Sequence, residues 1–330
     1  MAELGNVWPG AVGVSGGGDS VALMHLLADW AAAQNRPPPI VLTVDHGLAP
    51  GSRQRARAVI DAARALKLEA TLLAWKGDKP LSDVEAAARQ ARYRLMGDWC
   101  RKHAIKALYI AHTEDDQAET FLLRLARGSG LDGLCAMRPA APWPVPGFEE
   151  LSLLRPLLGM TRADLRQSLT ARGIGWQEDP MNADTRFARI RLRQLRPALE
   201  EAGLSAARIA AAAKHLSRAR DALELQTAQL LAAATRRDGQ NLLIDRAALK
   251  SAPRELGLRA LADLLKGEGK QVYRPRFEQL EALYDALEDT KFRARTLHGC
   301  RLGPAPRRSA AFGAGTLMLA PEQGRAKPAK

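Results

Sequence analysis

The sequence predicts an α/β fold: a doubly wound parallel sheet followed by a smaller, mainly helical domain. Three observations support this fold class. From residue 11, short apolar runs alternate with helical patterns, and conspicuous polar residues directly follow several of the apolar runs. An alanine-rich helical stretch, 205–234, then opens a second half of different character. We therefore expect helices on both faces of the sheet and ligands at the carboxyl ends of its strands.

The first half justifies this fold element by element. The strand candidates are 11–14, 40–44, 71–75, 107–111 and 151–154. The helical stretches are 20–34, 52–67, 83–103, 115–126 and 162–172. Prolines at 139, 142, 144 and 146 predict an extended loop over 139–147 rather than a helix or strand, because proline fixes φ and has no N–H.

The composition changes near Pro197, so we expect a first domain over 1–198 and a second over 199–320. The second domain continues with helical patterns at 254–266 and 276–288 and ends in β-like runs at 296–302 and 310–319. The Pro/Lys/Gly-rich tail, 321–330, is expected to be disordered.

The bulk composition bounds the class of protein. At 330 residues and 46% hydrophobic content the chain can bury two cores, and its net charge of +13 favours a polyanionic partner such as nucleic acid. Cys100, Cys135 and Cys300 form no CxxC pair, so they indicate neither a disulfide framework nor a metal cluster. No signal peptide or membrane span is apparent, which predicts a cytoplasmic protein without membrane association; whether it forms a homodimer stays open.

The most informative motif follows the first strand candidate. Three glycines in a row accept positive φ and let backbone N–H groups approach an anion, while the next helix adds its positive end. The loop differs from the Walker type, because it carries an acid where that motif has lysine, and an acid beside phosphates implies a bridging cation. The residues expected to hold a nucleotide are Ser15, Gly16, Gly17, Gly18, Asp19 and Ser20.

A second motif, His112–Thr120, starts at a strand end and continues into a helix. Asp115 and Glu119 share a face of that helix, and His112 lies at its start. Negative charge therefore gathers at the sheet edge that also carries the glycine-rich loop. These acids can hold a cation or an ammonium group; the alternative is that they complement the helix dipole. The helix ends in a glycine exit, Arg127–Gly133, that serves as a C-cap and can also lie against a nucleotide.

Two basic patterns complete the set. Arg89 and Arg92 share a helix face with Glu85, which by itself also fits an ordinary surface ion pair. Asp179–Asn182 is followed by an arginine-rich stretch without acids, which suits the phosphates of a nucleic acid. Its arginines are Arg186, Arg189, Arg191, Arg193 and Arg196.

The Ser15–Ser20 loop resembles the SGGxDS loop of the ATP pyrophosphatase (PP-loop) superfamily, whose fold is adenine nucleotide alpha hydrolase-like. With Val44–Leu48, His112–Thr120, Arg127–Gly133 and Asp179–Asn182, residues 11–197 resemble the tRNA(Ile)-lysidine synthetases. The resemblance implies ATP and Mg²⁺ as cofactors. It also implies that lysine is joined to C2 of the wobble cytidine of a CAU-anticodon tRNA(Ile), through an adenylated cytidine.

The resemblance also implies residue roles. Asp19 would hold the metal, and the catalytic candidates are Asp19, His112, Asp115 and Asp116. Either His112 or a carboxylate could remove the proton from lysine, and the carboxylates could hold lysine or metal. Asp45, Gly128 and Gly130 join the nucleotide loop as expected ATP-binding residues. The expected substrate-binding residues are Arg89, Arg92, Glu119, Arg186, Arg189, Arg191 and Arg193.

Two other readings stay open. A tRNA-thiolating enzyme of the same superfamily would need paired cysteines or a sulfur-carrying cysteine, which the isolated cysteines do not suggest. A catalytically idle, basic RNA-binding protein on this fold would have no use for Asp19 together with His112–Glu119.

Overall fold

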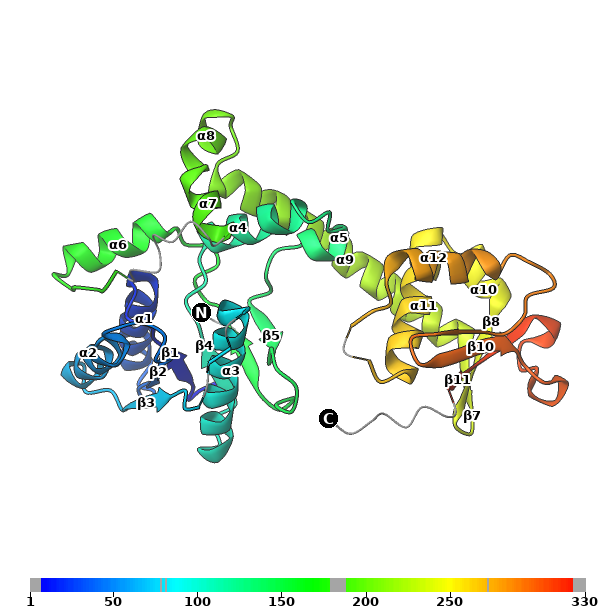
Figure 1. Ribbon diagram of the computed structural model, residues 1–330, viewed down its shortest axis with the longest axis horizontal. Coiled ribbons are helices and arrows are strands. Elements are labelled where there is room, and N and C mark those ends of the chain that lie inside the picture. Colours follow the sequence, from blue (N-terminus) through cyan, green and yellow to red (C-terminus); the bar gives the residue numbers. More distant parts are fainter. Residues whose placement is uncertain (1–6, 78, 81, 179–187, 272, 323–330) are drawn as a thin grey trace. The chain divides into compact units, whose positions relative to one another are not determined.

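A computed structural model describes residues 7–77, 79–80, 82–178, 188–271 and 273–322 (Figure 1). The chain folds as two compact units, residues 1–217 and 218–330. The division lies within the long helix α9 (Ala206–Ala234), whereas the sequence places the domain boundary at 198. The start of α9 belongs to the first unit, because the Ala136 N–H donates to the carbonyl of Ala213 at 3.2 Å.

The first unit is built on a sheet with the strand order β3-β2-β1-β4-β6-β5. All neighbouring strands pair parallel except β5, which pairs antiparallel with β6. The strands are β1 (Ala11–Gly13), β2 (Ile40–Asp45), β3 (Ala70–Ala74), β4 (Ala107–Tyr109), β5 (Ala140–Pro142) and β6 (Ser152–Leu154).

Both faces of this sheet are buried, which confirms the doubly wound class. Successive strand residues point to opposite faces: Val12 and Val41 pack in one core cluster, whereas Ala11 and Leu42 pack in another. The first cluster includes side chains of α1 (Gly18–Ala33), α2 (Ser52–Ala65) and α6 (Arg162–Ala171), and the second includes side chains of α3 (Val84–Lys102). The sequence shows this arrangement as short apolar runs rather than as strict alternation.

Five helices of the first unit match the predicted stretches closely, whereas the three short helices Leu131–Leu134, Ala188–Gln194 and Arg196–Glu201 were not predicted. They are α1 (Gly18–Ala33), α2 (Ser52–Ala65), α3 (Val84–Lys102), α4 (Glu114–Leu125), α5 (Leu131–Leu134), α6 (Arg162–Ala171), α7 (Ala188–Gln194) and α8 (Arg196–Glu201). The expectation that 139–147 contains no element was wrong at β5. Ala140 and Ala141 keep their N–H groups, and at the sheet edge Pro142 is tolerated.

The second unit combines helices with an antiparallel sheet of order β7-β8-β11-β10-β9. Its strands are β7 (Thr235–Asp238), β8 (Asn241–Asp245), β9 (Arg295–Leu297), β10 (Cys300–Pro304) and β11 (Thr316–Pro321). Its helices are α10 (Arg246–Ser251), α11 (Arg254–Glu268) and α12 (Phe277–Ala286), with short 3-10 turns η3 (Arg307–Ser309) and η4 (Gly313–Gly315). The sheet is thus larger than the two β-like runs in the sequence suggest. Residues 323–330 of the predicted tail lie outside the described residues. Among the described helices, none has the length and apolar character needed to cross a bilayer.

Candidate active site

The glycine-rich loop joins β1 to α1 at the carboxyl edge of the sheet. Val14 extends the strand by donating its N–H to the carbonyl of Leu42 at 2.9 Å, and α1 begins at Gly18. Gly16 has a φ of +95°, which an L side chain rarely adopts. Because α1 begins at Gly18, Asp19 and Ser20 lie in its first turn, where the Ser20 N–H donates to the carbonyl of Gly17 at 3.0 Å.

The hydroxyl of Ser20 closes the loop. It accepts the N–H of Ser15 at 3.1 Å and donates to the carbonyl of Gly17 at 2.8 Å. The segment 176–178 braces the loop from outside: the Gln177 N–H donates to the carbonyl of Gly16 at 2.9 Å. Trp176 lies beside Gly18, where an added Cβ would stand 3.4 Å from its ring. The loop is thus held in shape before any ligand binds.

A cavity of about 800 Å³ opens at this edge of the first unit, within the size range of small-molecule sites. It brings together most of the predicted site residues: Ser15, Gly17, Gly18, Asp19, Ser20, Arg89, Arg92, His112, Asp115, Asp116, Glu119 and Arg193. The loop, the acidic helix and two arginines of α3 therefore share one chamber.

The start of α4 is fixed by a capping box. The Asp116 N–H donates to Oγ1 of Thr113 at 3.4 Å, and Oδ2 of Asp116 accepts the N–H of Thr113 at 2.9 Å. The other oxygen of Asp116, Oδ1, accepts a hydrogen bond from Arg162. Asp116 thus both starts the helix and carries charge at the cavity.

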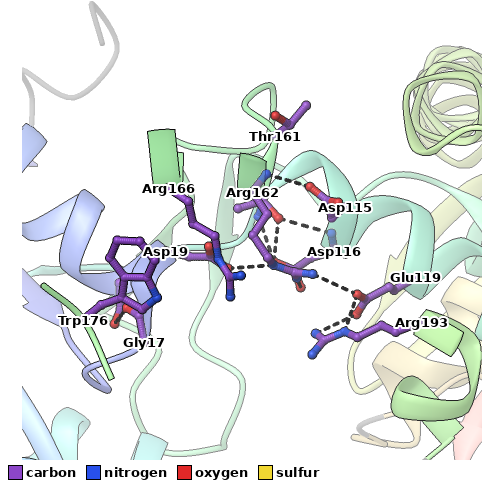
Figure 2. Close-up of polar contacts among 12 residues, drawn as sticks. Gly17, Asp19, Asp115, Asp116, Glu119, Thr161, Arg162, Arg166, Trp176 and Arg193 are labelled. Carbon is purple, nitrogen blue, oxygen red and sulfur yellow. Dashed lines mark hydrogen bonds and ion pairs between the residues drawn. The ribbon is translucent and has the colours of Figure 1, made fainter. Parts of the chain in front are cut away.

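Arg162, the first residue of α6, lies between the loop and the acidic helix (Figure 2). Its Nε donates to Oδ2 of Asp19 at 3.1 Å, its Nη2 to Oδ1 of Asp116 at 3.2 Å and its Nη1 to Oε1 of Glu119 at 3.4 Å. Burial alone would lower the pKa of this guanidinium, but the charges of Asp116, Glu119 and Asp19 outweigh burial and raise it. The Arg162 guanidinium therefore links the glycine-rich loop to the acidic helix α4.

Two arginines of the basic stretch also pair with the acidic helix. Arg193 donates to both oxygens of Glu119, at 2.7 and 3.1 Å, and Arg196 donates to Oδ1 of Asp115 at 2.7 Å. The sequence suggested phosphate contacts because the stretch 185–197 contains no acid, although Arg196 also pairs with Glu200, four residues further along, at 2.7 Å. The fold supplies the acids from α4.

The Asp19 carboxylate has one committed oxygen and one unsatisfied oxygen. Oδ2 accepts from Arg162, whereas Oδ1 is buried with no hydrogen-bond partner among the described residues. Burial raises the pKa of Asp19, while the nearby Arg162 lowers it. Within the described ranges, no three His, Cys, Asp or Glu side chains gather as a metal cluster. A single free carboxylate oxygen still fits Mg²⁺, which proteins commonly hold through one or two carboxylates plus substrate phosphates.

His112 lies beyond the end of β4 and contacts Arg155, which directly follows β6. Nε of Arg155 is 3.0 Å from Nδ1 of the imidazole. Burial, followed by the charge of Arg155 and of further arginines, lowers the pKa of His112 to about 3. The ring is therefore neutral at physiological pH.

Several predicted residues lie elsewhere. Asp45 does not line the cavity: its Oδ1 accepts from the Gly47 N–H at 3.0 Å and from the Ser52 hydroxyl at 2.7 Å, so it orders the turn after β2. Gly128 and Gly130 lie at the end of α4 and the start of α5, outside the cavity lining. Gly16, Arg189 and Arg191 are also absent from the lining. Arg186 and Asp179–Asn182 lie outside the described residues.

Sequence reasoning missed Arg155, Arg162 and Arg166. Arg162 and Arg166 line the cavity, and Arg155 holds His112. A signal for two of them was present: Arg155 directly follows a predicted strand, and Arg162 opens the next predicted helix.

Comparisons with known proteins agree with this geometry. The model of the PP-loop domain family matches residues 9–199. The chain is 40% identical to the tRNA(Ile)-lysidine synthase of Methylobacterium nodulans over 95% of this chain and 92% of that protein. It is 42% identical to that of Rhodopseudomonas palustris, over 85% and 80%, and 40% identical to that of Ruegeria pomeroyi, over 88% and 67%.

A solved structure supports the fold independently. The U34-tRNA thiolase NcsA from Methanococcus maripaludis superposes with a TM-score of 0.51 at 15% identity, over 63% of this chain and 71% of that one. At this identity the likeness concerns the fold alone. The match to the PP-loop family and the identity to several lysidine synthases over most of their length lead to one conclusion: this chain is a member of the tRNA(Ile)-lysidine synthase family.

Proposed function

We propose that this protein joins L-lysine to C2 of the wobble cytidine in CAU-anticodon tRNA(Ile), consuming ATP and releasing AMP and pyrophosphate. The product, lysidine, would switch codon reading from AUG to AUA. The observation that carries the proposal is the single cavity in which the PP-loop and the acidic helix α4 face each other. Family membership supports the same activity.

The first step is adenylation of the base. The loop residues 15–20 and the start of α1 hold the triphosphate, and O2 of cytidine attacks the α-phosphorus. The bond to the bridging oxygen breaks, and pyrophosphate leaves with its electron pair. When bound at Oδ1 of Asp19, Mg²⁺ supplies positive charge that offsets the charge of the leaving group.

The second step forms the carbon–nitrogen bond. The ε-amine of lysine attacks C2, the bond between C2 and O2 breaks, and O2 departs with AMP. The amine is protonated at neutral pH and must lose a proton before it attacks. The acidic side chains of α4 suit the binding of this ammonium group, because Asp115, Asp116 and Glu119 all line the cavity.

The tRNA partner fits the charge of the chain. The net charge of +13 and the exposed Arg189 of α7 favour contacts with RNA phosphates. Arg89 and Arg92 line the cavity from α3 and suit a phosphate or the lysine carboxylate. The absence of a membrane-spanning helix among the described residues is consistent with our proposal of a cytoplasmic enzyme.

The thiolation alternative is weakened by the cysteines. Cys100, Cys135 and Cys300 are all buried, and burial raises the pKa of Cys100 to about 12 and that of Cys300 to about 11. A sulfur-carrying thiol needs access and thiolate character. None of these positions offers both.

The experiment that tests the proposal is transfer of labelled lysine onto unmodified CAU-anticodon tRNA(Ile) with ATP and Mg²⁺. The control is the same tRNA with another base in place of the wobble cytidine. We expect incorporation that requires both ATP and the cytidine. Bound tRNA without incorporation would overturn the proposal.

A further inference from the structure

The contact between Arg155 and His112 fixes both the position and the tautomer of the His112 ring. β4 and β6 are parallel neighbours, and the Ile110 N–H donates to the carbonyl of Leu154 at 2.9 Å just beyond the paired residues. The fold therefore delivers His112 and Arg155 side by side at the carboxyl edge. Nη1 of Arg155 also donates to the carbonyl of Arg138 at 2.9 Å, which holds the guanidinium in place.

Donor and acceptor chemistry then decides the tautomer. A guanidinium has only N–H donors, so the nitrogen that faces it must accept. Nδ1 of His112 lies 3.0 Å from Nε of Arg155 and is therefore the acceptor. In a neutral imidazole the proton then resides on Nε2. The lone pair that could take a proton is already engaged.

We propose that His112 acts as a neutral hydrogen-bond donor through Nε2, held in that tautomer by the positioning residue Arg155, and not as the base that deprotonates lysine. This inference rests on the proposed function and rejects one of the two candidates, His112 or a carboxylate, that the sequence leaves open for the base. Because His112 lines the cavity, its N–H is available to a substrate oxygen that gains negative charge during adenylation.

The surroundings of His112 reinforce the neutral form. Arg89 and Arg92 of α3 and Arg189 of α7 act on the ring together with Arg155, and each of these charges disfavours an imidazolium. No carboxylate is among the charges that dominate at this ring. The proton of the lysine ammonium therefore goes to another group, and the carboxylates of α4 are the remaining candidates among the proposed site residues.

Substitution of His112 separates the two roles. The amide nitrogen of His112→Gln can stand near the position of Nε2, where it donates a hydrogen bond but cannot act as a base; His112→Asn reaches only to the position of Nδ1. Loss of one such donor costs about 10²–10³-fold in rate. We expect His112→Ala and His112→Asn to lose about that much in lysine transfer, and His112→Gln to stay within about tenfold of the wild type.

Equal losses for His112→Gln and His112→Ala, measured beside an active wild type, would overturn the donor role. Absence of lysine transfer by the wild type would instead refute the proposed function. The two failures are therefore distinct.

A measurement without substrate tests the tautomer itself. In protein labelled with ¹⁵N-histidine, we expect the His112 ring to show a protonated Nε2 and an unprotonated Nδ1 that does not titrate between about pH 5 and 8. In Arg155→Met, Nδ1 loses the donor that it faces, so we expect part of the population to carry its proton on Nδ1, and kcat for lysine transfer should fall. Arg172→Met, which removes an exposed arginine paired with Asp29, serves as the control. A proton on Nδ1 of the wild type, or nitrogen shifts that Arg155→Met leaves unchanged, would overturn the assignment.

Discussion

Arg162 gives the most specific prediction, because its one guanidinium pairs with three carboxylates. Its nitrogens lie 3.1, 3.2 and 3.4 Å from oxygens of Asp19, Asp116 and Glu119, and these side chains are only 10–23% exposed. At an effective dielectric constant of about 20, each pair is worth roughly 5 kcal/mol of attraction, most of which desolvation offsets. Removing one partner of a buried network typically costs about 3–5 kcal/mol.

We therefore expect Arg162→Met to lower the free energy of unfolding of the first unit by about 3 kcal/mol, the lower end because the site is partly solvated. For a unit of this size, that corresponds to roughly 6–12 °C in Tm. Tryptophan fluorescence isolates this unit, because all tryptophans lie within it: Trp8, Trp30, Trp75, Trp99, Trp143 and Trp176. Arg172→Met removes an exposed pair with Asp29 and should cost about 1 kcal/mol at most.

The pH dependence provides a second check on Arg162. Without the guanidinium, Asp19 loses the charge that lowers its pKa, while burial and the nearby Asp116 still raise it above its value in the unfolded chain. The ionisation of Asp19 then opposes folding more strongly at neutral pH, and the deficit relative to the wild type should shrink as pH falls and this carboxylate becomes protonated. Equal losses for Arg162→Met and Arg172→Met, or a deficit that persists at acidic pH, would refute this reasoning.

Three further predictions concern the loop and the RNA. Asp19→Asn should abolish ATP–pyrophosphate exchange but leave the Tm unchanged or higher. Burial raises the pKa of Asp19, so the charge of this carboxylate opposes folding at pH 7. A lower Tm for Asp19→Asn would contradict this reasoning. Gly16→Ala should lower the free energy of unfolding by about 1–2 kcal/mol, measured by thermal melting, because the φ of Gly16 is +95°. Gly17 has a φ of −70°, so Gly17→Ala should keep this stability but weaken ATP binding in a filter assay. Equal stability losses for the two variants would contradict the loop geometry. Arg189→Met should weaken tRNA binding and reduce the slope of log K against log salt concentration by about 1. Arg193 already pairs with Glu119, so Arg193→Met should change this slope less. Identical slopes for the two variants would contradict this division of roles.

Much of the first unit was predictable because its strands are short and buried on both faces. The strand predicted at 40–44 is observed at Ile40–Asp45, and the helix predicted at 162–172 is observed at Arg162–Ala171. In the second unit β7 carries Arg236, Arg237 and Asp238 and gives no apolar signal. Its pairing with β8 depends on residues that only the fold brings together.

The site was predictable in its parts but not in its connections. The loop and the acidic helix are visible as local motifs, and both line the cavity. The link between them is not local: Arg162 is 143 residues from Asp19 and 46 residues from Asp116 in the chain. Without an alignment or a fold, no spacing rule connects such distant residues. For the same reason, the sequence did not show that Arg193 and Arg196 pair with acids of α4.

The small edge strand β5 affects how readily the sheet of the first unit pairs with strands of other molecules. An edge strand normally presents N–H and carbonyl groups on which a strand of another molecule can assemble. Here the edge consists of two alanines and Pro142, with Pro139 just before them, and prolines offer no N–H to a newcomer. On this side the sheet is therefore a poor template for aggregation, which matters in a chain that must expose its apolar runs each time it folds beside other copies on a ribosome.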